Sequence, residues 1–311
     1  PFATVDLMNL HSCIIGEFAY VQAGELFHRK IDPGTVWVRN QNFEFKYKFN
    51  KEILDNYVGV NPMYQPRGVI YDFVKDREKD FEKIFDVMNL SPIDAPESSA
   101  INRYAVVQGK INIGKNVLVS QRAFLDNAVM GDGSNAQENS YIIHSTLAGL
   151  NVTAHGGKII HADMGIETFV GFNSFLNGKP GARITIGDGC IVMPHTIIDS
   201  DVPLNIPGDH LVGGFIGSEE DIQNNTISFD DLAEVRESLK IGKMTFSGMG
   251  SVFIETYRKR INQILMSNGA RFHEGEQRGH AQDDQNISFN IIQPYRTGEL
   301  MGLYPSIRIK P

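Results

Sequence analysis

A six-residue repeat constrains the fold of this chain more than any other feature of its sequence. Small or aliphatic residues recur at every sixth position, and the fourth residue after many of them is small or β-branched. Gly, Asn and Asp fill many of the intervals. The repeat runs through Met130, Ala136, Ile142, Ala148, Ala154 and Ile160, with shorter runs at Ile113, Val119 and Leu125, at Met164, Val170 and Leu176, and at Ile186, Val192 and Ile198.

A period of six matches neither the two-residue alternation of a strand nor the turn of an α-helix. It fits a solenoid in which each hexapeptide supplies one short strand and one corner, so that three hexapeptides make a triangular coil of about 18 residues. This pattern resembles the left-handed β-helix of the hexapeptide-repeat proteins. The alternative is a β-sandwich with accidental spacing, which the number of matches disfavours. We therefore predict a mainly β fold, a left-handed parallel β-helix with an α/β insertion and a helix-containing C-terminal extension.

The extent of the repeat divides the chain into four parts. The first part rests on a single step, from Ile15 to Val21, and the second contains the predicted helix "DREKDFEKIFDVMNL". A predicted helix in the last part places Phe253, Tyr257 and Ile261 on one face. The four parts are a candidate first coil (1–26), an inserted or capping segment (27–100), the main β-helix (101–216) and the C-terminal extension (217–311).

The composition excludes several classes of partner. The formal net charge is −8, and a cationic face is what binding to nucleic acid or to an anionic membrane requires. No apolar run approaches the roughly 20 residues of a membrane span. Two cysteines are too few for a disulfide framework, which favours a cytoplasmic protein. The chain begins with Pro1 rather than Met, which indicates a processed or trimmed start and leaves a removed N-terminal signal open.

Three of the nine histidines lie close together, at His144, His155 and His161. None falls on an inward position of the repeat, so we expect all three side chains to point outward. His144 and His161 are 17 residues apart, close to one coil, and should stack near one edge, whereas His155 should project from a neighbouring face. Two imidazoles from one chain and one from a second copy would leave a fourth position open, as in catalytic zinc sites. This arrangement predicts a homotrimer.

The segment "RAFLDNAVMGDGSNAQENSYIIHS…NVTAHGGKIIHADMGIETFVGFNSFLNG" resembles the γ-class carbonic anhydrases and their relatives. The resemblance covers about residues 101–216. Several features depart from the family pattern, among them that the last two histidines are six residues apart instead of five and that Glu138 stands where the family has Asp. The matching positions are Arg122, the Met130-Gly131 corner, Asn135, Gln137, His144 and His161.

This resemblance implies a metal and a reaction. It implies that His144, His155 and His161 bind zinc, although iron and cobalt also suit three imidazoles. Bound water would then ionise near neutral pH and hydrate CO2 to bicarbonate. Three further residues would assist: Gln137 by hydrogen bonding to the metal-bound oxygen, Asn135 by orienting the substrate, and Arg122 by pairing with a carboxylate across the protomer contact.

Two other functions stay open on the same fold. The first is an acyltransferase in which His155 or His161 acts as general base and a pantetheine arm lies along the coils between protomers. The stretch "SDVPLNIPGDHLVGG" is similar to the closing coil of such enzymes. The second is a non-catalytic trimeric assembly subunit, because residues 27–100 and 217–311 add surface rather than recognisable chemistry. His195, in "VMPHTII", is predicted to be structural.

Overall fold

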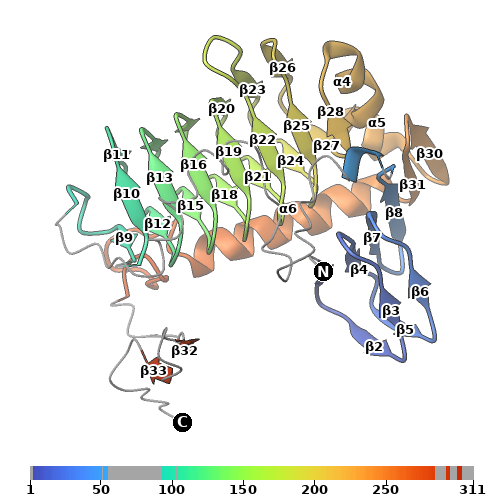
Figure 1. Cartoon of the computed structure of the whole chain (residues 1–311), viewed down its shortest axis with the longest axis horizontal. Helices are drawn as coiled ribbons and strands as arrows, with labels where there is room; N and C mark the ends of the chain where they lie inside the picture. The colour runs from blue at the N-terminus through green and yellow to red at the C-terminus, as the bar shows by residue number, and fades with distance from the viewer. Residues whose placement is uncertain are drawn as a thin grey trace.

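The computed structural model describes residues 3–50, 52–54, 93–102 and 104–283, with the backbone of 292–294 and 300–302. Between Ala100 and Ile216, three parallel sheets wind into a triangular solenoid whose strands stack coil upon coil (Figure 1). The fold is the mainly β, left-handed β-helix that the repeat predicts.

Each sheet of the solenoid forms one face. An eight-stranded sheet forms the face under the long C-terminal helix, which we call the helix-covered face: β9 (Ala100–Ile101), β12 (Leu118–Val119), β15 (Asn135–Ala136), β18 (Val152–Thr153), β21 (Phe169–Val170), β24 (Ile191–Val192), β27 (His210–Val212) and β29 (Thr226–Ser228). The second face has seven strands: β10 (Val106–Gln108), β13 (Phe124–Asp126), β16 (Tyr141–Ile143), β19 (Lys158–Ile160), β22 (Phe175–Asn177), β25 (Ile197–Asp199) and β28 (Phe215–Ile216). The third has six: β11 (Asn112–Ile113), β14 (Val129–Met130), β17 (Thr146–Leu147), β20 (Ala162–Met164), β23 (Ile184–Ile186) and β26 (Leu204–Ile206).

The coils from β12 to β21 are one residue shorter than three hexapeptides. Successive strands of the helix-covered face pair there at a spacing of 17 residues, as between Leu118 and Asn135, whereas β21 and β24 pair at a spacing of 22. The shortening occurs between the second and third faces, where two residues separate β16 from β17, whereas four separate β15 from β16. The inward residue after Ile142 is therefore Leu147, which is fully buried, while Ala148 is exposed. The strict six-residue repeat was thus wrong by one position at Ala148, Ala154 and Ile160.

Helix α6 (Gly250–Ser267) lies along the helix-covered face, as Figure 1 shows. Its buried Phe253, Ile261 and Leu265 belong to one apolar cluster with outward residues of the solenoid such as Val152 and Phe169. This confirms the predicted helix. Polar contacts fix the helix and the segment after it: Arg258 with Asp209 at 2.9 Å, Arg271 with Glu167 at 2.8 Å, and Asn268 hydrogen-bonded to Asn135.

The N-terminal residues form a second, smaller coil stack. Its strands pair in parallel at a spacing of 16 residues, as between Thr4 and Tyr20, and its core includes Ala19, Val21 and Trp37. We call it the N-terminal stack: β1 (Thr4–Val5), β2 (Asn9–His11), β3 (Ile14–Ile15), β4 (Tyr20–Gln22), β5 (Glu25–Phe27), β6 (Lys30–Ile31) and β7 (Thr35–Arg39).

The N-terminal stack shares no sheet with the main solenoid among the described residues. Its last strand pairs with β8 (Phe43–Lys48), which continues antiparallel into β31 (Met244–Gly248) and β30 (Ser238–Ile241). The first residues thus coil, but on an axis of their own rather than as a coil of the main β-helix. The division of the chain at residues 26, 100 and 216 stays a prediction, because much of 27–100 lies outside the described residues.

Short elements complete the C-terminal part. Helix α4 (Glu219–Asn225) begins at Ser218 and α5 (Phe229–Glu234) at Ser228, and both serines accept a backbone hydrogen bond as N-caps. The pair β32 (Ile292–Pro294) and β33 (Leu300–Gly302) is antiparallel. The predicted helix "DREKDFEKIFDVMNL" and the stretch "PSIRIKP" lie outside the described residues. Within the described part of the chain, no helix combines the length and apolarity needed to cross a membrane.

Candidate functional site

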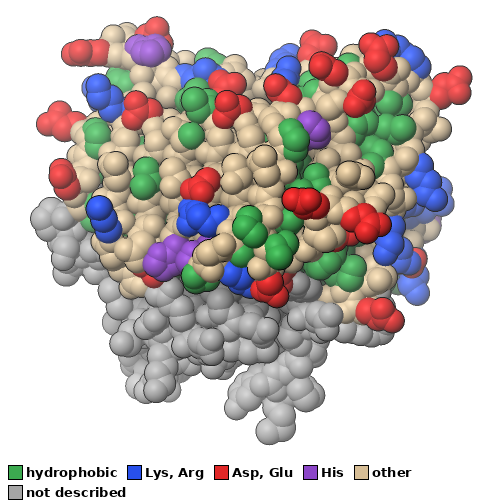
Figure 2. Space-filling view, turned by 90° about the horizontal axis from the view of Figure 1, so that it is seen from above, with side chains coloured by type: hydrophobic (Ala, Val, Ile, Leu, Met, Phe, Trp, Pro, Cys, Tyr) green, Lys and Arg blue, Asp and Glu red, His purple; other side chains and the backbone are tan. Residues whose placement is uncertain are grey.

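The three clustered histidines occupy two different edges of the solenoid. His144 follows β16 and His161 follows β19, so both lie between the second and third faces. His155 follows β18 and lies between the helix-covered and second faces. Histidines also lie at separate places on the face seen in Figure 2, where acidic and basic side chains are interspersed. His155 and His161 are only six residues apart, but strand β19 lies between them and places them on different edges.

We call the first of these the paired-histidine edge, defined by His144 and His161. Both residues adopt left-handed backbone conformations, with φ of 49° and 45°, which makes the two-residue corner there. Their rings stack in parallel, with centroids 4.8 Å apart and planes 3° apart. Burial lowers the pKa of His161, and the positive charges of His144, Arg183 and Lys179 lower it further. His161 thus favours the neutral state.

The second edge, which we call the cavity edge, carries Glu138, His155, Phe172 and His195. His155 Nδ1 lies 2.6 Å from Glu138 Oε2, in the corner one coil earlier, and the imidazole stacks on Phe172 with centroids 5.3 Å apart. Burial would raise the pKa of Glu138, but the hydrogen bond from His155 and other local contacts outweigh it and leave the pKa lowered. The carboxylate is therefore held ionised against the imidazole, and the Nε2 atom stays available.

His195 shares this edge but lies fully inside the protein. Its ring is 0% exposed and lies 4.6 Å from the Phe18 ring and 6.0 Å from the Tyr20 ring of the N-terminal stack. Burial lowers the pKa of His195 to about 3, with the Phe18 backbone acting weakly in the other direction. The side chain has the buried, structural place that the sequence indicated, and it has no route to solvent for proton transfer.

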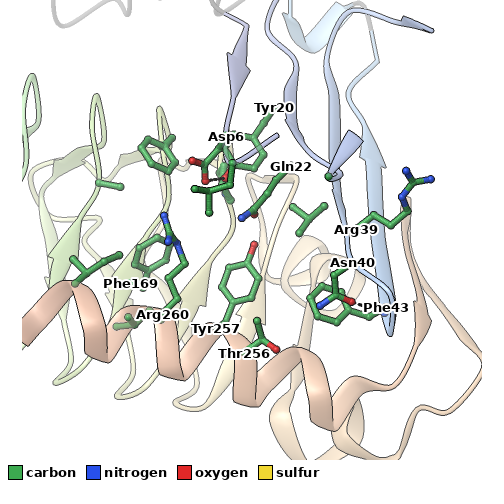
Figure 3. Close-up of a pocket in the computed structure, with 18 of the residues that line it drawn as sticks. Asp6, Tyr20, Gln22, Arg39, Asn40, Phe43, Phe169, Thr256, Tyr257 and Arg260 are labelled. Carbon is green, nitrogen blue, oxygen red and sulfur yellow. Dashed lines mark hydrogen bonds between the residues drawn. The ribbon is translucent and has the colours of Figure 1, made fainter. Parts of the chain in front are cut away.

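A cavity of about 340 Å³ borders the cavity edge. It lies between the N-terminal stack, helix α6 and the helix-covered face, and Figure 3 shows side chains from all three converging on it. Phe172 lines the cavity on the side where His155 stacks, and Gln137 and Ala154 line it next to Glu138 and His155 in the chain. The His155–Glu138 pair therefore stands at its rim.

The other predicted site residues are distributed around this region. Gln137 lines the cavity and is partly buried. Asn135 is 0% exposed, because its side chain points outward beneath the end of α6, donates to the Gly133 carbonyl and accepts from Asn268. Arg122 occupies a left-handed corner with φ of 59°, two coils before His155 on the cavity edge. Within one chain, the structure brings Gln137 near His155 but not near the stacked histidines.

The described residues of a single chain contain no group of three His, Cys, Asp or Glu side chains able to hold a metal ion. The predicted metal site needs a second copy in any case, since His155 lies on a different edge from His144 and His161. Each histidine could contribute one nitrogen: Nε2 of His155 is opposite its carboxylate-bound Nδ1, an arrangement common among metal-bound histidines. Three histidines at a protomer contact thus stay a prediction.

Comparisons with known proteins bear on the family. A family model described as "Hexapeptide repeat including loop" matches residues 1–62, which include the N-terminal stack. The crystal structure of a candidate acetyltransferase from Desulfovibrio desulfuricans G20 aligns with 100% of this chain at 49% identity and a TM-score of 0.85. The chain has the hexapeptide-repeat β-helix fold. It spans 65% of the length of that relative.

A second structure is much less similar to this chain. PerB from Caulobacter crescentus, solved in complex with CoA and GDP-perosamine, covers 45% of this chain and 62% of its own at 19% identity, with a TM-score of 0.30. A similarity of that size carries no functional argument. No curated protein matches the chain. Neither structure is described as a carbonic anhydrase.

Several residues of the cavity edge were not found from the sequence. Glu138 was noted only as a departure from a family pattern, yet it is the partner of His155. The 17-residue spacing from Glu138 to His155 could have revealed the pair, because it is the coil repeat in this part of the solenoid. Asp6 lies far in sequence from Tyr257 and Arg260, and it meets them only because the N-terminal stack and α6 pack on the same face.

Proposed function

We propose that the protein transfers an acyl group from a CoA thioester to a small acceptor, with His155 as the general base. The observation that carries this proposal is the 2.6 Å contact between His155 Nδ1 and Glu138 Oε2 at the rim of a cavity. A carboxylate at Nδ1 fixes the tautomer and orientation of the ring and stabilises the imidazolium that forms when Nε2 accepts a proton.

The proposed reaction has two steps. A hydroxyl or neutral amine of the acceptor attacks the thioester carbonyl carbon, and His155 Nε2 takes the proton from that nucleophile. The C–S bond then breaks, and the leaving thiolate of CoA receives the proton from the imidazolium. The products are an ester or amide and free CoA thiol. Glu138 stays ionised throughout, since its pKa is lowered.

The other histidines suit this role less well. His195 is fully buried and has a pKa of about 3, so it can neither reach a substrate nor hold a proton at neutral pH. The rings of His144 and His161 stack on each other, and neither has an ion pair with a carboxylate in the described part of the chain. Burial and neighbouring positive charges also lower the pKa of His161. His155 alone combines exposure, a carboxylate partner and a neighbouring cavity.

The relative supports the same reaction class. Identity of 49% over the whole of this chain to a candidate acetyltransferase favours a shared chemistry. Because this chain spans 65% of that protein, its activity and its substrates stay proposals here. We propose further that the protein acts as a homotrimer, because the open edges of a β-helix are where copies of a chain can contact one another and where the polar side chains of each edge would gain partners.

An activity assay tests the proposal. The purified chain is mixed with acetyl-CoA and a panel of small amines and alcohols, and free thiol is measured. We expect thiol release above the buffer rate, a loss of roughly 10²- to 10⁴-fold in kcat for His155→Ala, and a change of less than about twofold for His144→Ala, which serves as the matched control. Equal losses in both variants, or no release with any acceptor, would contradict the proposal.

A second candidate function has one observation in its favour. The parallel stacking of His144 and His161 at 4.8 Å presents two imidazoles together at an open edge, as a metal site completed by His155 of another copy would need. Zinc, iron or cobalt there would supply a metal-activated water for CO2 hydration. Gln137 lines the neighbouring cavity, while the buried Asn135 would act only through packing.

Elemental analysis decides this second candidate. Near-stoichiometric metal per chain after metal-supplemented expression, lost in His161→Ala but kept in His195→Ala, is the result expected of a shared site. Trace occupancy would refute it. A metal-loaded protein that does not hydrate CO2 would leave the site in place and refute the carbonic anhydrase activity.

A further inference from the structure

We propose that the cavity beside His155 binds a small zwitterion with an apolar body, of the amino-acid type. The cavity has the volume of a small-molecule site, about 340 Å³, and combines apolar walls with a few polar side chains. The charged groups at the cavity decide the class of ligand.

Two opposite charges face the cavity from different elements. Asp6 follows β1 of the N-terminal stack and Arg260 lies on α6, and both line the cavity. They form no ion pair with each other or with any other residue in the described ranges. Asp6 Oδ2 accepts a hydrogen bond from the Tyr20 hydroxyl at 3.1 Å, which fixes the carboxylate in place. A fixed anion and a separate cation suit a ligand that carries both charges.

Arg39 also lines the cavity, but its guanidinium already contacts other groups of the protein. Its guanidinium donates to the Ala23 carbonyl at 3.1 Å and lies over the Trp37 ring at 4.8 Å. Figure 3 shows its side chain turned away from the labelled groups around Asp6. Arg260 is therefore the cation that can meet a carboxylate of the ligand, and a guanidinium binds a carboxylate well through paired N–H donors.

Uncharged polar groups face the same space. In Figure 3 the Tyr257 hydroxyl points from α6 toward Gln22 of the N-terminal stack. Neither side chain has a hydrogen-bond partner in the part of the chain that the structure describes. Burial raises the pKa of Tyr257, Asp6 raises it further and Arg260 lowers it, so both charges act at this hydroxyl. These groups can bind the polar end of a ligand between the two charges.

The remaining walls are apolar and partly aromatic. They would bury the body of the ligand, and they leave little reason for a highly polar molecule such as a sugar to bind there. A ligand with only an ammonium group would leave the charge of Arg260 without an opposite charge, and a ligand with only a carboxylate would leave the charge of Asp6 without one. The apolar lining includes Val38, Phe43, Phe169, Phe172, Ile261 and Ile264.

Three probes with the same body separate these cases by titration calorimetry on the full chain, without CoA. L-phenylalanine carries both charges, phenethylamine only the ammonium, and 3-phenylpropionate only the carboxylate. We expect L-phenylalanine to bind about tenfold or more tightly than either of the others, since each charge-assisted contact is lost in one of them. Equal or tighter binding of one singly charged probe would overturn the zwitterion, and no binding of any of the three at millimolar concentration would overturn the site.

Two variants locate the charges. Asp6→Asn keeps an acceptor for Tyr20 and should weaken L-phenylalanine and phenethylamine at least about tenfold, with little effect on 3-phenylpropionate. Arg260→Gln, at an exposed helix position, should weaken L-phenylalanine and 3-phenylpropionate instead. Lys259→Gln, exposed and outside the cavity lining, is the matched control. Unchanged affinities in both cavity variants would refute the assignment, and thermal unfolding shows whether each variant is folded.

The claim that this zwitterion is the acyl acceptor rests on the proposed function. The claim that the cavity binds the zwitterion does not. The two claims fail separately. Binding without thiol release from acetyl-CoA would leave the cavity site and refute the transferase, and thiol release without binding of any probe would do the reverse.

Discussion

The two histidine-bearing edges of the solenoid have the same local geometry and different chemistry. On the paired-histidine edge, His161 has another imidazole one coil below it and two cations nearby. On the cavity edge, His155 has a carboxylate one coil below it and an aromatic ring beside it. In a solenoid the residue one repeat away is the nearest neighbour, so it decides what a corner residue can do.

The cavity edge also shows how the same corner changes along the solenoid. Left-handed positions there hold Asn139, Asn173 and His195. Asn173 reaches the N-terminal stack through a hydrogen bond to Thr4, but His195 packs its ring on Phe18 and is the one of the three that is fully buried. The N-terminal stack therefore converts one end of the edge into core and leaves the His155 end open as the rim of a cavity. Predictions on single histidines can test this contrast.

The largest effect should come from His195. His195→Asn keeps a residue type already found in this left-handed corner but removes a ring packed on Phe18, and we expect a loss of about 2–3 kcal/mol in the free energy of unfolding at pH 8. Because the pKa of His195 is lowered to about 3, the wild type loses stability as pH falls from about 6.5 toward 3, when the unfolded state takes up the proton first.

The difference in the free energy of unfolding between wild type and His195→Asn should therefore shrink as pH falls. Urea unfolding at pH 8, 6.5 and 5 measures it, with His273→Asn in the exposed C-terminal loop as the control. A difference that stays constant over this range would mean that the ring is not held neutral by burial. It would also weaken the distinction between the two ends of the cavity edge.

The main solenoid could be predicted from the sequence because each repeat buries the same kind of residue at the same place. Met130, Ala136 and Ile142 were located correctly, and all are at most 1% exposed. The one-residue error after Ile142 arose from a corner that His144 makes in a left-handed conformation, which the hydrophobic pattern does not record. The stacking of His144 and His161 followed from their spacing alone.

The cavity could not be predicted in the same way. Its walls come from residues near 6, 172 and 260, and no periodic pattern links them. Tyr257 was assigned to the apolar face of its helix, and the structure places its ring against Phe253 but its hydroxyl at the cavity. Contacts between a solenoid and the segments that pack on it depend on long-range docking, which a repeat does not encode.

The next effect is on catalysis, at the carboxylate that distinguishes the two edges. Glu138→Gln keeps a hydrogen-bond acceptor for His155 Nδ1 but removes the charge that stabilises the imidazolium, so we expect kcat for thiol release from acetyl-CoA to fall by roughly 10- to 100-fold. Glu138→Ala removes orientation as well and should fall further. Asp163→Asn, near the paired-histidine edge, should change kcat by less than about twofold. If Glu138→Gln were as active as wild type, the His155–Glu138 pair would be a structural ion pair only.

The smallest effect should come from the paired-histidine edge. His161→Asn suits the left-handed corner, since Asn127 occupies the equivalent position two coils earlier. Burial, His144 and nearby cations lower the pKa of His161, so the wild type loses stability as pH falls below the ordinary histidine range, and the variant should lose less. The ring is partly exposed and solvent screens these charges, so the gain of the variant at pH 5 should stay below about 1 kcal/mol. Thermal unfolding at pH 7.5 and pH 5 measures it, and 1 M NaCl should reduce it further. A variant that is less stable than wild type by the same amount at both pH values would show that the stacked rings stabilise this edge by packing, with no contribution from charge.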